Sequence, residues 1–167
     1  MRVREATSDD YDEIARLTVA AYRALDTWVG DDYAAHLADV AARAGDESTI
    51  VLVAEDDGGG RILGSVTLTL GEGPYFEWAH GVDGDCGFRM LAVDPAAQGK
   101  GVGPRLVDEC LDRARAAGCS RMVIGSTEWM VIAHRLYGRV GFRRAPELDQ
   151  QWGDIRGLCF VLDLLAI

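Results

Sequence analysis

The chain has 167 residues, of which 49% are apolar and 26% are charged. This length and composition exclude a disordered or fibrous chain and predict a single domain over residues 1–167, built around one core. The 17 Lys and Arg residues against 27 Asp and Glu give a formal net charge of −10. Such a surface argues against a nucleic-acid partner, because a polyanion gains little from binding to it.

Membrane and metal sites are also not expected. No stretch approaches the ~20 consecutive apolar residues of a membrane-spanning helix, and the first residues lack the apolar core of a secretory signal. We therefore expect a soluble cytoplasmic protein. The four cysteines and three histidines are scattered without metal-ligand spacing, so we predict no metal site and interpret the cysteines as small apolar residues.

The N-terminal part of the chain predicts a strand, two helices and a hairpin. A short strand covers residues 3–6, and apolar residues at three- and four-residue spacing predict a helix that ends near Leu25. A second helix begins at Asp31 and ends near Gly45. The β-branched run 49–54 and the alternating run 62–70 flank a glycine-rich turn, which predicts two antiparallel strands.

The rest of the chain alternates strands and helices. Residues 71–87 contain five glycines and predict a long loop that walls a substrate site. A strand at 88–93 then leads through a glycine-dense turn into an amphipathic helix that ends near Gly118. A strand at 122–125, a helix capped by Thr127, a polar segment at 143–153 and a strand at 158–162 complete the pattern. Trp28 and Trp152 fall in predicted loops, where they either form pocket walls or pack against the edge of the domain.

The glycine-dense turn carries the most specific signal, with the sequence Gln98-Gly99-Lys100-Gly101-Val102-Gly103. Alternating glycines let backbone N–H groups converge on a phosphate, and the positive end of the following helix adds to the attraction. The spacing differs from the dinucleotide fingerprint, and Gly101 stands where a nucleoside-triphosphate loop needs Ser or Thr. The turn therefore indicates a phosphate site of another kind, with a ligand-free strand-to-helix connection as the alternative.

This turn is similar to the acyl-CoA loop of the GNAT superfamily of N-acetyltransferases, whose pattern is Q/R-x-x-G-x-G/A. About thirty residues later, the segment from Ala133 to Phe142 resembles the family's A-x-x-L-Y-x-x-x-G-F segment. The order of predicted elements also resembles the family's order over nearly the whole chain. The resemblance implies an α/β GNAT fold with a mixed, mostly antiparallel sheet, splayed between its fourth and fifth strands and flanked by about four helices.

The resemblance implies acetyl-CoA as co-substrate, with its pyrophosphate held by the backbone N–H groups of residues 98–103. It also implies that Leu91, Ala92 and Val93 pair with the pantetheine arm, and that a backbone N–H near Leu91 polarises the thioester carbonyl. Many family members carry Asn where this chain has Met130. Because a thioether cannot donate a hydrogen bond, Ser126 and Thr127 are the candidates to replace that contact.

Tyr137 matches the tyrosine that protonates the departing thiolate in this family, although its helical spacing alone favours a core aromatic. The attacking amine also needs a base, since an ammonium with a pKa near ~10.4 must first lose a proton. We expect Asp85 to be this base, with Glu77 second. The further candidates near the fourth strand or at the start of the late helix are His80, Asp83 and Glu128. Arg89 is expected to face the substrate side of the strand, where it can bind a carboxylate.

The sequence thus predicts an acetyl-CoA-dependent N-acetyltransferase that acts on a primary amine of a small molecule, by direct attack in a ternary complex. Two alternatives stay open. One is a non-catalytic module of the same fold that binds acyl-CoA as a sensor, and the other is an acetyltransferase for a protein amine. A nucleotide-binding protein with an unusual loop is a more distant third. The apolar C-terminal residues, Leu164 to Ile167, favour a homodimer over a monomer.

Overall fold

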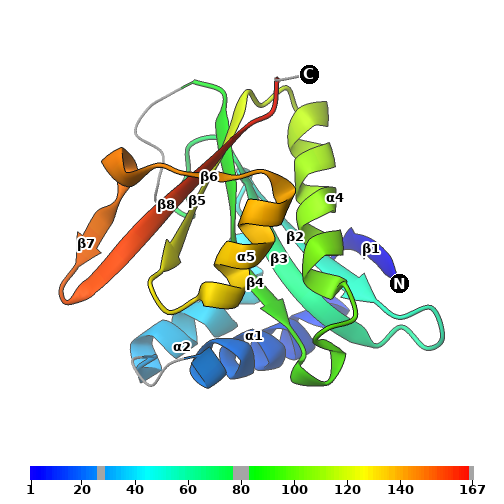
Figure 1. The fold of residues 1–167 in the computed structure, drawn as a ribbon. Coiled ribbons are helices and arrows are strands. Elements are labelled where there is room, and N and C mark those ends of the chain that lie inside the picture. Colours follow the sequence, from blue (N-terminus) through cyan, green and yellow to red (C-terminus); the bar gives the residue numbers. More distant parts are fainter. Residues whose placement is uncertain (26–28, 77–82, 166–167) are drawn as a thin grey trace.

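The computed structural model describes residues 1–25, 29–76 and 83–165 (Figure 1). The elements are β1 (Arg2–Glu5), α1 (Tyr11–Leu25), α2 (Asp31–Ala38), α3 (Val40–Ala44), β2 (Thr49–Glu55), β3 (Ile62–Leu70), β4 (Asp85–Val93), α4 (Val102–Ala116), β5 (Arg121–Thr127), α5 (Val131–Val140), β6 (Arg143–Arg144), β7 (Gln150–Trp152) and β8 (Ile155–Asp163). Single 3₁₀ turns cover Ser8–Asp10, Pro95–Ala97 and Pro146–Leu148. This order confirms the predicted succession of strands and helices.

All eight strands belong to one sheet, in the order β1-β2-β3-β4-β5-β8-β6, and β7 also pairs with β8. Every neighbouring pair is antiparallel except β4 and β5, which are parallel. The predicted mixed, mostly antiparallel sheet is therefore confirmed. The parallel pair is possible because α4 connects the two strands, as a crossover connection requires.

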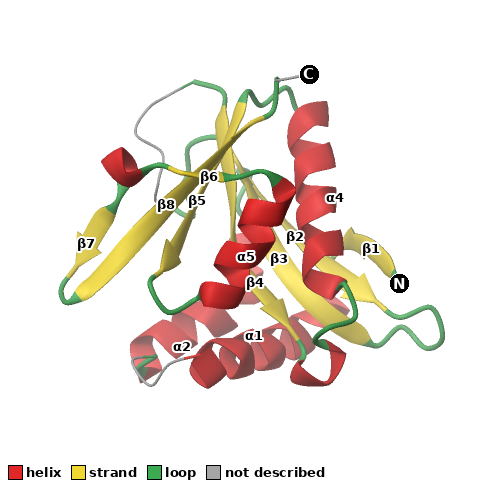
Figure 2. Ribbon diagram, in the orientation of Figure 1, coloured by secondary structure: helices red, strands yellow, loops and turns green. Residues whose placement is uncertain are grey.

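Helices cover both faces of the sheet (Figure 2), which explains why both sets of side chains on the central part of β2 are apolar. On β2, Leu52 and Ala54 belong to the core cluster that includes α4 and α5. Val51 and Val53, which point the other way, pack with α1 and α3. The second face of the sheet is therefore covered by another layer of helices.

The parallel strands β4 and β5 separate almost as soon as they meet. Only two residue pairs join them, Asp85 with Arg121 and Cys86 with Met122. Further along, β4 carries a bulge, because the register with β3 shifts between Ser65 and Thr67 and brings Arg89 opposite Thr67. Met90, within the bulge, has a φ of 54°, a left-handed conformation that costs a non-glycine residue ~1–2 kcal/mol. The predicted splay between the fourth and fifth strands is confirmed.

Buried contacts hold this bulge in place. The Met90 side chain is 3% exposed and packs with Val29, Ala34 and Leu37 of the α2 region. Burying a side chain of this size contributes ~1.5–3 kcal/mol, which offsets the backbone strain. The α1–α2 layer therefore stabilises the local distortion that separates the strands.

The closed end of the splay is fixed by an ion pair. Asp85 accepts two hydrogen bonds from Arg121, at 2.9 Å to Nε and 2.6 Å to Nη2. The carboxylate is 3% exposed and the guanidinium 27% exposed. This bidentate contact joins the first residue of β4 to the first residue of β5, so it ties together the two strands at the point where they still pair.

A second carboxylate organises the C-terminal strands. Asp149 accepts two hydrogen bonds of 2.8 Å from Arg144, one of 2.9 Å from the Cys159 amide and one of 3.2 Å from Arg156. These donors lie on β6 and β8, and Asp149 immediately precedes β7. Asp149 therefore fixes where the β7–β8 hairpin leaves the sheet.

Several boundaries differ from expectation. The second predicted helix is two helices, because Asp39 leaves the helical conformation with a ψ of 67° and its side chain caps α3 through the Ala42 amide. The strand β4 begins at Asp85 rather than at residue 88, and the polar segment 143–153 contains β6 and β7. Helix α5 has Met130 as its N-cap, so the expectation that Thr127 caps it was wrong.

Some expectations concern residues outside the described ranges. Trp28, Ala166 and Ile167 are among them, as is part of the long loop after β3. Within residues 1–25, 29–76 and 83–165, no helix combines the length and apolarity needed to cross a membrane. The same residues contain no group of three His, Cys, Asp or Glu side chains arranged to hold a metal ion.

Replacing Asp85 by Asn should destabilise the fold. The substitution removes the charge that pairs with Arg121, and hydrogen bonds to a charged group contribute about 1.5–3 kcal/mol each. We expect thermal unfolding to show a midpoint several degrees lower than in the wild-type chain. Asp83→Asn is the matched control, because Asp83 is exposed and two residues away, and its midpoint should stay unchanged. Equal midpoints for both variants would contradict a structural role for Asp85.

The Asp149 contacts should make stability depend on pH below 4. Hydrogen bonds from Arg144 lower the pKa of Asp149 from 3.8 to about 2. A lowered folded-state pKa stabilises the fold at pH values above the unfolded pKa, and this stabilisation is lost as the pH falls through the folded pKa. We expect Asp149→Asn to be less stable than wild type by roughly 2 kcal/mol at pH 7. Urea unfolding at pH 7, 4 and 2 should show this gap closing between pH 4 and 2, and a gap that stays constant would contradict the assignment.

Candidate active site

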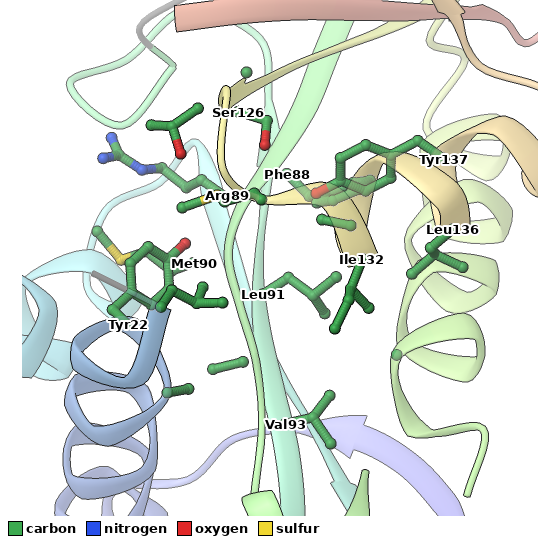
Figure 3. A pocket seen from close by; sticks show the side chains of 18 of the residues that line it. Tyr22, Phe88, Arg89, Met90, Leu91, Val93, Ser126, Ile132, Leu136 and Tyr137 are labelled. Carbon is green, nitrogen blue, oxygen red and sulfur yellow. The ribbon is translucent and has the colours of Figure 1, made fainter. Parts of the chain in front are cut away.

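A cavity of about 1030 Å³ occupies the region where β4 and β5 separate (Figure 3). The strand β4 runs through it and divides its lining. Leu91 and Val93 project to one side with Tyr137, whereas Tyr22 and Met90 lie on the other. We call the first the loop side, since Leu91 and Val93 pack there with α4, which the glycine-dense turn precedes. We call the second the aromatic side, since Met90 packs there with Tyr22 and Tyr33, and Tyr75 stacks on His36 of α2. Phe76 and Trp152 line the same cavity.

The loop side contains the glycine-dense turn that the sequence singled out. Gly99 and Gly101 have φ values of 76° and 81°, which side chains other than glycine rarely adopt. Gly101 is also the N-cap of α4, so the turn presents backbone N–H groups at the positive end of a 15-residue helix. Asp94 supports the entry to the turn by accepting hydrogen bonds from the Ala96 amide at 2.9 Å and from Arg61 at 2.9 Å.

The structure brings almost all of the predicted cofactor-binding residues together. Eight of the nine line the cavity, namely Leu91, Ala92, Val93, Gln98, Gly99, Gly101, Val102 and Gly103. Lys100 is exposed and is not among the residues that line it. Its side chain therefore does not help to form the cavity, which agrees with a loop that acts through its backbone.

Polar groups on the loop side suit a ligand that carries amides. Past Cys86, β4 has no ladder pairs with β5 among the described residues, so its edge is open to an added strand-like partner. The Thr127 hydroxyl is buried, lines the cavity and makes no hydrogen bond within the described chain. Met130 lines the cavity as well. A pantetheine arm, with its two amides, matches both the open strand edge and the Thr127 hydroxyl.

Tyr137 lies inside an aromatic cluster and also borders the cavity. Its ring centroid is 5.9 Å from that of Phe88, 5.8 Å from Phe142 and 5.5 Å from Phe160. The side chain is 5% exposed, and burial raises the pKa of its phenol. The hydroxyl therefore keeps its proton across the physiological pH range, which is what a proton donor requires.

The structure adds a pair of polar side chains that sequence reasoning missed. The Oγ of Ser126, a cavity-lining residue on β5, is 3.0 Å from Nε2 of His134 on α5. Burial lowers the pKa of His134, whereas a hydrogen bond with the Thr127 backbone acts in the opposite direction. Burial thus favours the neutral form of the imidazole, which is the form that can accept a proton. The two residues are eight positions apart, across the turn from β5 to α5, so no local spacing rule pairs them.

Within the described residues, none of the carboxylates considered as bases lines the cavity. Asp85 forms an ion pair with Arg121 at the closed end of the splay, and Asp83 is exposed. Glu128 is 56% exposed and lies 3.9 Å from Arg156. Glu77 and His80 are outside the described residues. Among residues 1–25, 29–76 and 83–165, no carboxylate lines the cavity.

Arg89 lines the cavity, as expected, and its Nη1 donates a 3.3 Å hydrogen bond to the Tyr75 carbonyl. The aromatic side draws its walls from elements that are distant in sequence. Tyr22 of α1 and Tyr33 of α2 have ring centroids 6.4 Å apart. Trp152 of β7 lies against Gly157, where an added Cβ would come within 2.8 Å of its indole. The predicted pocket-wall position of Trp152 is confirmed.

Comparisons with known proteins agree with this architecture. The sequence model of the acetyltransferase (GNAT) family matches residues 10–142. A mycothiol acetyltransferase from Beutenbergia cavernae is 31% identical over 109 residues, which are 64% of this chain. The matched segment spans 33%, or about a third, of the length of that curated relative.

Solved structures show the same fold over nearly the whole chain. A GNAT-family acetyltransferase from Staphylococcus aureus Mu50 has a TM-score of 0.76 at 13% identity, over 98% of both chains. The protein yncA from Salmonella typhimurium, solved with its cofactor acetyl-CoA, has a TM-score of 0.68 at 25% identity, over 98% of this chain and 93% of its own. Because the family model matches most of its length, the chain belongs to the acetyltransferase (GNAT) family.

Proposed function

We propose that the protein transfers the acetyl group of acetyl-CoA to a primary amine of a small molecule, and that the amine attacks the thioester directly in a ternary complex. The observation that supports this proposal is a single cavity of about 1030 Å³, in which two differently lined sides meet at the β4 bulge. A donor on the loop side and an acceptor on the aromatic side can occupy it together, so no covalent enzyme intermediate is needed.

The loop side would hold acetyl-CoA, which supplies a thioester whose carbonyl carbon is the electrophile. The backbone N–H groups between Gln98 and Gly103 would bind the pyrophosphate, supported by the dipole of α4. Leu91 and Val93 would pair with the pantetheine arm along the open edge of β4. The backbone N–H at the bulge, nearest Leu91, would donate to the thioester carbonyl and stabilise the charge that develops there.

The acceptor would bind on the aromatic side. Its walls come from α1, α2, the loop after β3 and β7, and surrounding walls of this kind suit a compact molecule better than an extended chain. The 31% identical relative is a mycothiol acetyltransferase, which also supports a small acceptor. A protein amine is the second candidate acceptor, and a substrate panel separates the two.

Binding of acetyl-CoA should stabilise the fold through the glycine turn. At ~100 times its dissociation constant, a ligand adds ~2.7 kcal/mol, which raises the unfolding midpoint by several degrees. We expect this rise with acetyl-CoA and with CoA, and not with ATP or NAD. Gly101→Val should abolish the rise, because a branched residue cannot hold a φ of 81° without strain.

The matched control for that experiment is Gly60→Val. Gly60 has a φ of 67° in the β2–β3 turn and does not line the cavity, so the variant should lose stability yet keep the acetyl-CoA shift. A rise with ATP alone, or an unchanged shift in Gly101→Val, would overturn the assignment of the loop side.

Turnover should depend on the Tyr137 hydroxyl. With spermidine, tyramine, kanamycin, L-lysine and an alanine-started peptide as acceptors, we expect release of CoA thiol with at least one small amine. In Tyr137→Phe, kcat should fall roughly 100-fold because the thiolate then leaves without a proton donor. The affinity for acetyl-CoA should stay unchanged, since the ring is retained. Because burial raises the phenol pKa, wild-type activity should not decline through pH 10.

Three other outcomes would each point elsewhere. Turnover with the peptide alone would assign a protein acceptor. Acetyl-CoA binding without turnover for any amine would favour a non-catalytic sensor. Equal kcat values for wild type and Tyr137→Phe would reduce Tyr137 to a core aromatic.

A further inference from the structure

We propose that Ser126 and His134 form the path that removes the proton from the acceptor ammonium, with Ser126 as the group that touches the acceptor and His134 acting through it. This inference rests on the proposed acetyltransferase function and deepens it. It fills the role that the sequence assigned to carboxylates, none of which lines the cavity within the described ranges.

Ser126 lies at the position that this role needs. If the register of the two β4–β5 pairs is continued past Cys86 and Met122, Ser126 comes level with Met90, across the gap from the bulge. Figure 3 shows its hydroxyl directed into the cavity, between the side chains of Arg89 and Tyr137. The side chain is 4% exposed, so its hydroxyl is held within the wall of the cavity. An amine that attacks a thioester carbonyl bound at the bulge would pass close to this hydroxyl.

His134 is fixed behind Ser126. Its Nε2 is 3.0 Å from the Ser126 Oγ, and its ring centroid is 5.0 Å from that of Phe160. Phe160 also contacts Tyr137, so one aromatic ring orients both the proton-accepting histidine and the proton-donating tyrosine. The imidazole is half-buried, which leaves it a route to pass a proton to solvent.

The charges around His134 favour its neutral form. Arg144, on β6, lies over the Phe160 ring that also packs against His134, with its Cζ 5.4 Å from the centroid of the Phe160 ring. The charge of Arg144 adds to burial in lowering the pKa of His134. Arg144 is itself paired with Asp149, and the hydrogen bond with the Thr127 backbone acts in the opposite direction on the pKa of His134. Ser126 is uncharged, so burial and these neighbouring groups determine the direction in which the pKa of His134 shifts.

Each proton transfer on this path breaks one bond and forms another. An N–H bond of the acceptor ammonium breaks as an O–H bond forms on Ser126, and the original Ser126 proton moves to Nε2 of His134, which later releases it to solvent. The neutral amine then forms a C–N bond with the thioester carbon, and the C–S bond breaks. Tyr137 gives its proton to the sulfur and regains one from the nitrogen, which leaves an amide and a free thiol.

Kinetics across pH test this path. With tyramine, or whichever amine of the panel turns over fastest, kcat/KM at pH 7 should fall roughly 100-fold in Ser126→Ala and in His134→Gln. At pH 10 the deficit should shrink to within about 10-fold, because solvent then deprotonates an amine with a pKa near ~10.4. Ser120→Ala, the same change next to the other end of β5, should behave as wild type. A loss that is equal at pH 7 and pH 10 would indicate a merely structural role and overturn the proposal.

A second measurement needs no acceptor and so separates failure of this inference from failure of the proposed function. In ¹⁵N-labelled full-length protein at pH 7, long-range ¹H–¹⁵N spectra report which ring nitrogen carries the proton, and His134→Gln identifies the signals among the three histidines. We expect a neutral His134 whose Nε2 is unprotonated and accepts from Ser126. A ring protonated at Nε2, or an acetyl group found on Ser126 after incubation with acetyl-CoA alone, would overturn the relay.

Discussion

The separation of β4 from β5 is the constraint on which the cavity and its chemistry depend. Two parallel strands in one sheet normally continue to pair, because each unpaired backbone group loses a hydrogen bond. Here the pairing ends after Cys86 and Met122. The cost is held down by the Asp85–Arg121 ion pair at the closed end and by the buried Met90 side chain at the bulge. The open backbone edge that results is the surface a strand-like ligand can complete.

The two polar functions of the site meet across this gap. Tyr137 approaches from α5 on the loop side, and Ser126 approaches from β5. Both are connected to Phe160, directly for Tyr137 and through His134 for Ser126. In the proposed mechanism, the proton donor and the proton acceptor therefore keep a fixed relative position, because the Phe160 ring packs against both Tyr137 and His134. Such fixed placement lowers the reorganisation that each proton transfer would otherwise require.

The features that sequence reasoning predicted are those with a local cause. The glycine turn at the start of α4 followed from glycines next to a helix start, and the helices followed from their apolar spacing. The features it missed depend on distant contacts. In the sequence, Asp85 is interpreted as a loop carboxylate close to the strand that would become β4. The fold shows that Asp85 pairs with Arg121, which lies 36 residues later in the chain. Likewise, the Ser126–His134 contact joins residues on β5 and α5 that are eight positions apart, so it depends on how α5 leaves β5.

The β7 strand has a consequence for how such a protein can change its substrate. It pairs with β8 and stands off the main path of the sheet, while Asp149 fixes the base of the hairpin through Arg144 and the Cys159 amide. Trp152 packs on Gly157 of β8, so its exchange would change the wall of the cavity and leave the β4–β5 pairs in place. In the proposed enzyme, acceptor specificity could therefore change within one short hairpin while the strands that hold the thioester stay the same.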